Sequence, residues 1–151
     1  MDESAFRRTR NAVAPRPCAF EKAMLAGACA CSLAARRNIA EREAVTCDSE
    51  PAREACTALS KLLRQKSAFA LKLTHVEAPL PHAKQMKVEC GGLRGLQQAA
   101  NPGAEDHAST GDVHRLVQAC AEKFGGLENL PYSAIVQSVV SYQLRRRRPE
   151  Q

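Results

Sequence analysis

Five cysteines in this sequence stand where thiolates could bind a metal. Cys29 and Cys31 flank one alanine in a run of small side chains, and eight residues separate Cys47 from Cys56. Cys47 lies just before a predicted helix, where backbone N–H groups and the helix dipole stabilise a thiolate. Cys90 precedes two glycines, which let backbone amides approach bound sulfur or metal closely. We therefore predict a thiolate metal site built from these five cysteines.

Four thiolates suit a [4Fe–4S] cluster or a tetrahedral zinc ion. The cysteine spacing matches neither the paired C-x2-C of a zinc ribbon nor the C-x2-C-x2-C of a ferredoxin. We favour an iron–sulfur cluster, because the candidate ligands are all thiols and the C-x2-C pair common in structural zinc sites is missing. Such a centre would serve electron transfer or redox sensing with a redox partner protein. Zinc, a thiol redox switch and metal-free packed thiols remain alternatives.

Helix geometry decides whether Cys29 and Cys31 can share one site. Side chains two residues apart in an intact helix diverge by roughly 200°. Both thiols can therefore bind one metal only if the helix that begins near Cys18 ends or breaks near Gly27. If the helix continues, only one of the two thiols faces inward.

The remaining cysteines and the histidines have simpler interpretations. Cys120 lies on the apolar stripe of a predicted helix, where a free cysteine acts as a small hydrophobic residue. Cys18 adjoins the N-terminal arm and is interpreted as an incidental thiol. His107 and His114 are expected to be solvated. His82 is kept as a reserve ligand or proton carrier.

The elements that must position these residues are predicted to be helices. A long helix over about residues 50–73 has Asp48 or Ser49 as its cap and Leu59, Leu63 and Phe69 among its inward residues. Residues 36–43 mix both charge signs, with Glu41 four residues after Arg37, and are interpreted as a solvated helix face. Their arginines could instead steer an acidic partner.

The second half continues the helical pattern. Met86–Cys90 alternates and is expected to be a short extended segment or an irregular turn, followed by a short helix from about residue 93 to 100. Thr110 or Asp112 caps the next helix, which ends at Gly125, and Pro131 opens the last one.

Composition supports an all-α fold of about four to five helices. The 151 residues include no Trp and few other aromatic residues, and Ala and Leu dominate the apolar set. We predict a disordered arm over 1–17, a helical cysteine-bearing domain over 18–144 and a basic tail over 145–151. No apolar run is long enough for a membrane span. We therefore expect no membrane association.

Charge and cysteine usage limit the function classes. Much of the formal charge of +6 lies in the two ends, so Arg145–Arg148 gives only a weak indication of nucleic-acid contact. Seven cysteines without an export signal indicate a reducing, cytoplasmic location. The sequence contains no phosphate loop, nucleophile elbow or paired carboxylates, so we do not expect an enzyme. The main alternatives to the metal protein are a metal-free helical interaction module and a zinc-stapled adaptor.

Overall fold

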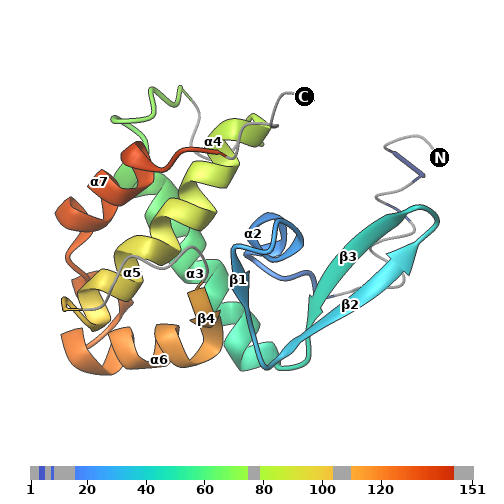
Figure 1. The fold of residues 1–151 in the computed structure, drawn as a ribbon, viewed down its shortest axis with the longest axis horizontal. Coiled ribbons are helices and arrows are strands. Elements are labelled where there is room, and N and C mark those ends of the chain that lie inside the picture. The colour runs from blue at the N-terminus through green and yellow to red at the C-terminus, as the bar shows by residue number, and fades with distance from the viewer. Residues whose placement is uncertain (1–3, 6–7, 9–15, 75–78, 104–109, 145–151) are drawn as a thin grey trace, which may run out of the picture.

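The chain forms a helical body with a β-hairpin that projects from one side (Figure 1). The computed structural model describes residues 4–5, 8, 16–74, 79–103 and 110–144. Its helices are α2 (Glu21–Leu25), α3 (Glu50–Ser67), α4 (His82–Met86), the π-helix η1 (Lys87–Gly91), α5 (Gly92–Ala100), α6 (Val113–Phe124), the 3-10 helix η2 (Leu127–Asn129) and α7 (Tyr132–Ser141). Its strands are β1 (Cys29–Ala30), β2 (Ala34–Ile39), β3 (Arg42–Cys47) and β4 (Thr110–Asp112). The prediction of an all-α fold is therefore wrong.

The hairpin occupies the segment predicted to be a solvated helix. β2 and β3 pair antiparallel, and Ala40 adopts a φ of 56° in the turn between them. A guanidinium nitrogen of Arg36 lies 3.1 Å from a carboxylate oxygen of Glu43 across the strands, whereas a helix would have paired Arg37 with Glu41. Because both partners are about half exposed, this ion pair contributes at most about 1 kcal/mol.

Long-range strand pairing explains why the residues of β2 and β3 form strands although many of them favour a helix. Ala, Arg and Glu favour a helix in isolation. In β3, however, the β-branched Val45 and Thr46 are buried, and Cys18 donates its backbone N–H to the Val45 carbonyl at 2.9 Å. The Cys47 N–H donates in turn to the Arg16 carbonyl at 2.9 Å. The strand is thus hydrogen-bonded along both edges, which a surface helix could not be.

The predicted chain ends can be compared only in part. Pro17 bridges to Thr46, so the last residues of the predicted N-terminal arm belong to the sheet. Most of that arm and the whole basic tail, residues 145–151, lie outside the described residues.

The long helix α3 begins where the sequence predicted. The Ser49 hydroxyl accepts a hydrogen bond from the Ala52 N–H at 3.3 Å and caps the helix. Leu59 and Leu63 are fully buried, as predicted. The helix ends at Ser67 rather than near residue 73, and Phe69 beyond it is 98% exposed. The prediction that Phe69 faces the core is therefore wrong.

The Met86–Cys90 segment is helical, so the expected extended segment is also wrong. α4, η1 and α5 follow one another without interruption, and η1 has the wider turn of a π-helix. Val88, Glu89 and Cys90 are buried in succession. A strand on the surface of the body would have exposed every second residue.

Two glycines, Gly91 at the end of η1 and Gly95 in α5, allow these helices to pack against α7 backbone to backbone. A Cβ on Gly91 would lie 2.6 Å from the Val139 Cα, and one on Gly95 would lie 2.9 Å from the Ile135 Cα. A Cβ on Gly92 would lie 2.8 Å from a side-chain methyl of Leu63 on α3. The glycines after Cys90 thus serve helix packing, and the structure gives them a different role from the metal approach that we expected.

The predicted C-terminal helical hairpin is present. The Asp112 carboxylate accepts from the His114 N–H at 3.1 Å and caps α6, and Gly125 ends that helix with a φ of 75°. α7 begins after Pro131. A short parallel pair, β1 with β4, ties this half to the N-terminal half: the Thr110 N–H donates to the Ala28 carbonyl at 2.8 Å.

A buried carboxyl joins α2 to the π-helix. Glu89 is 2% exposed, and its carboxylate accepts from the Ala23 N–H at 3.1 Å and from the Gln85 amide at 2.6 Å. Burial raises the pKa of Glu89, against the opposing effect of these hydrogen bonds and of Lys22. Because the pKa is higher in the folded chain, folding takes up a proton between the unfolded and the folded pKa.

The stability of the protein should therefore decrease as the pH rises through that window. We expect Glu89→Gln to reduce this decrease, because the amide retains an acceptor for Ala23 and Gln85 can rotate to present its carbonyl. The measurement is the free energy of unfolding by urea at several pH values. Glu54→Gln removes an exposed carboxyl from α3 and should keep the original pH dependence. An unchanged pH dependence in Glu89→Gln would contradict the assignment.

Candidate functional site

Four cysteine residues from separate parts of the chain line one cavity. The cavity lies where the N-terminal segment, α2, the end of β3, the beginning of α3 and the first turn of α6 meet. It is about 20 Å³ in size, which is room for one water-sized group. The cysteines that line it are Cys18, Cys31, Cys47 and Cys56.

The backbone fixes three of these cysteines relative to β3. Cys18 and Cys47 lie on adjacent extended segments, joined by the backbone hydrogen bonds described above. Ala34 pairs with Cys47 across the hairpin and donates its N–H to the Cys31 carbonyl at 3.2 Å. Cys56 reaches the cavity from α3, about two turns beyond the cap.

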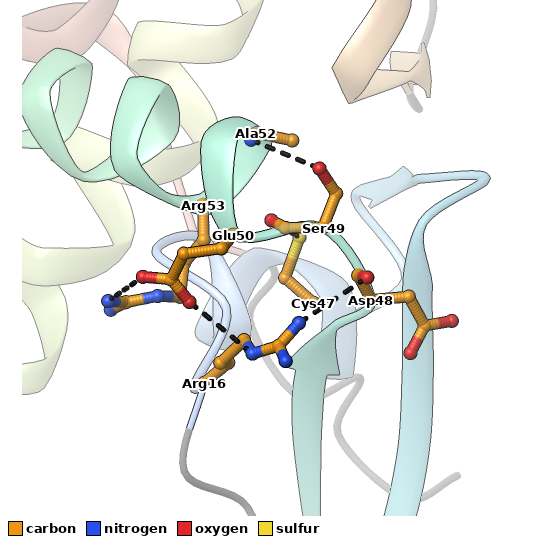
Figure 2. A network of polar contacts seen from close by, with 7 residues as sticks. All are labelled: Arg16, Cys47, Asp48, Ser49, Glu50, Ala52 and Arg53. Atoms are coloured by element: carbon orange, nitrogen blue, oxygen red, sulfur yellow. Dashed lines mark hydrogen bonds and ion pairs between the residues drawn. The ribbon is translucent and has the colours of Figure 1, made fainter.

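The cap of α3 also holds Cys47 in place. Figure 2 shows the Cys47 sulfur beneath the Ser49 carbonyl, to which the thiol donates at 3.2 Å. A guanidinium nitrogen of Arg53 lies 2.8 Å from one oxygen of Glu50, and Arg16 lies 3.3 Å from the other. Arg53 itself lines the cavity, and its buried Nε has no hydrogen-bond partner among the described residues. The edge of the thiol cavity therefore carries an unsatisfied donor on a cationic side chain.

Cys29 and Cys31 lie in two different environments. α2 ends at Leu25 and Gly27 has a φ of 75°, so the chain breaks where a shared site would require it. Cys31 reaches the cavity, whereas Cys29 is buried in the core and does not line it. Burial, together with a smaller effect of negative charge on Cys18 and Cys90, raises the pKa of Cys29 to about 12.

Cys90 and Cys120 lie away from the cavity. Cys90 is buried in η1, where burial raises its pKa and a hydrogen bond with the Tyr142 side chain opposes the rise. Cys120 is fully buried, and its thiol contacts the Leu96 carbonyl at 3.5 Å. The structural interpretation of Cys120 agrees with this position. Cys18, which the sequence analysis set aside, takes the place at the cavity that was expected for Cys90.

Three of the cavity thiols, those of Cys18, Cys31 and Cys56, have raised pKa values and are therefore protonated at neutral pH. Burial, together with a smaller effect of negative charge on neighbouring thiols, raises the pKa of Cys18 to about 11 and that of Cys56 to about 12. Burial also raises the pKa of Cys31, although the Leu33 and His114 amides oppose it. Thiols of this kind are poor nucleophiles.

The thiols are not arranged as a finished metal site. All seven cysteines are free. Within residues 16–74, 79–103 and 110–144, no group of three or more His, Cys, Asp or Glu side chains stands ready to hold a metal ion. The structure therefore contradicts the prediction of a metal-binding group among the cysteines. The wall of the cavity is apolar, and the thiols border it without surrounding a common point.

The positions of His114 and His82 differ from those predicted from the sequence. His114 lines the cavity from the first turn of α6, although it was expected to be solvated. Its position two residues after the capping Asp112 was the available signal. His82, the reserve ligand, instead contacts the Lys22 ammonium through Nδ1 at 3.0 Å, away from the thiols. His107 lies outside the described residues.

Comparison with protein families, curated proteins and solved structures finds no match for this chain. The case for its function rests on the arrangement of its own residues. None of the described helices is both long enough and apolar enough to cross a bilayer.

Proposed function

We propose that Cys18, Cys31, Cys47 and Cys56 bind a thiophilic metal centre after their side chains turn into the cavity they line. The observation that carries this proposal is that four cysteines, from four separate segments, line one small cavity. Metal ligands commonly gather in this way from distant parts of a chain, and a site rarely stands complete before the metal binds. The unformed state of the site is compatible with metal-coupled ordering.

Metal binding would change the protonation of the cavity thiols. Burial and the mutual repulsion of thiolates oppose deprotonation of Cys18 and Cys56. A bound metal ion reverses this balance, because it holds the ligands as thiolates and releases their protons. Arg53, which also lines the cavity, would supply a positive charge that offsets part of the negative charge of the thiolates.

The two forms of this centre that we predicted differ in the space they need. A single zinc ion would enter the small cavity with little displacement and would staple the hairpin to α3. An iron–sulfur cluster requires the walls to part further, and would give electron transfer or redox sensing with a redox partner protein. A cytoplasmic compartment would keep the thiols reduced in either form. No catalytic reaction is part of the proposal.

Metal and sulfide analysis of protein purified without oxygen tests the proposal. We expect about one zinc ion per chain, or iron with acid-labile sulfide and broad visible absorption if the centre is a cluster. Cys18→Ser and Cys56→Ser should each lose most of the metal. Cys90→Ala and Cys120→Ala remove buried thiols outside the cavity and should retain it. Protein without metal after reconstitution with zinc and with iron and sulfide, or equal metal content in all four variants, would overturn the proposal.

A further inference from the structure

A second pocket, more open than the thiol cavity, lies between α5 and the end of α7. It has a volume of about 270 Å³. α5 contributes Arg94 and Gln98, one helical turn apart, and the end of α7 contributes Ser138, Ser141 and Tyr142. The pocket thus offers a guanidinium, an amide, two hydroxyls and a phenol within one hollow. None of these side chains is acidic.

Arg94 is oriented but not neutralised. Its guanidinium carbon lies 4.9 Å from the centre of the Tyr142 ring, a cation–π contact that holds the side chain across the pocket. Among the described residues, Arg94 forms no ion pair. A planar guanidinium with available N–H donors binds the oxygens of phosphate with two parallel hydrogen bonds.

The carbonyls at the end of α7 would otherwise repel an anion. The C-terminus of a helix carries partial negative charge. Lys87 offsets this negative charge, because its ammonium donates to the Val140 and Tyr142 carbonyls at 2.9 Å each. Lys87 thus offsets the negative end of α7, beside which the pocket lies. The Ser138 hydroxyl can donate to a bound anion, and the Ser141 hydroxyl, which donates to the Ser138 carbonyl at 3.4 Å, can rotate to do so.

From this arrangement we propose that the pocket binds the phosphate group of a small phosphate monoester. Arg94 supplies the charge and the paired donors, and the serine hydroxyls add hydrogen bonds. A bare phosphate would leave part of the volume empty, which provides room for a compact organic group. This inference is independent of the thiol cavity, since none of the residues that line the pocket lines that cavity.

Titration of the full chain with phenyl phosphate, followed by backbone amide NMR, tests the inference. We expect the largest shifts at Gln98, Ser138 and Ser141, and a dissociation constant of the order of 1 mM. Arg94→Gln should weaken binding by about tenfold or more, because the charge-assisted hydrogen bonds are lost. Arg37→Gln removes the same charge from the exposed hairpin and should bind as the original chain does.

A second variant and a second ligand complete the test. Should Arg94→Gln fail to fold, Gln98→Ala combined with Ser141→Ala replaces it and should weaken binding in the same direction. Benzoate is the arm that separates phosphate recognition from general attraction of anions, and it should bind more weakly than phenyl phosphate. Shifts spread evenly over the molecule, equal binding by Arg94→Gln and Arg37→Gln, or equal binding of benzoate would overturn the inference.

Discussion

Replacing Gly91 with alanine should lower the free energy of unfolding by about 2–3 kcal/mol, as overpacking in a well-packed core does. The new methyl would lie 2.6 Å from the Val139 Cα and 2.7 Å from the Ser138 carbonyl oxygen. Both are backbone atoms, so no rotamer change relieves the contact, and α5 and α7 must move apart. The gain in helix propensity of alanine over glycine, about 1 kcal/mol, offsets only part of this cost.

Urea unfolding monitored by circular dichroism measures the effect. Gly111→Ala is the matched control, because a Cβ at Gly111 meets no atom within 4 Å in the described part of the chain. We expect it to change the stability by less than about 0.5 kcal/mol, as most exposed substitutions do. Similar stabilities for the two variants would show that the helices tolerate a wider separation than their packing implies.

Zinc added to reduced, metal-free protein should raise its thermal midpoint substantially. A ligand that binds only the folded chain stabilises it by about 4 kcal/mol when present at a thousand times its dissociation constant. The ligands that we propose come from the N-terminal segment, the end of β3 and α3, so the metal would hold together elements that now meet through a small apolar cavity. The measurement is the unfolding midpoint with and without zinc, under reducing conditions.

Comparing each variant with and without zinc separates ligation from packing. Cys56→Ser should lose the zinc-dependent increment. Cys90→Ala should lower the midpoint through lost packing and keep the increment, because Cys90 lies outside the cavity. An increment of equal size in both variants would place the zinc elsewhere on the chain.

The starts of α3, α6 and α7 could be predicted from the sequence because their signals are local. Ser49 and Asp112 cap within three residues, and Gly125 ends a helix through its own φ. The hairpin could not be predicted in this way. Its strands contain residues that prefer helices, and their pairing depends on the distant contacts of β3 with residues 16–18.

The candidate site was predicted in part for the same reason. Cys31, Cys47 and Cys56 were identified from their local settings, and all three line the cavity. Cys18 was missed because its place depends on hydrogen bonds to β3 that no local pattern announces. Cys90 was included because of two glycines whose space is filled by α7 and α3. Local sequence thus indicated which residues could bind, and long-range pairing decided which of them meet.

The short parallel pair of β1 with β4 has a consequence for how fast the protein folds. Cys29 pairs with Thr110, and the Asp112 carboxylate accepts from the Ser32 N–H at 3.2 Å, so these contacts close a loop of about 80 residues. Closing so long a loop costs chain entropy before any contact repays it, and such contacts slow folding. The segment that carries Cys29 and Cys31 should therefore reach its final position late, after the helical hairpin of α6 and α7 has formed. The rate of folding should then be governed by this two-residue join more than by the long helices.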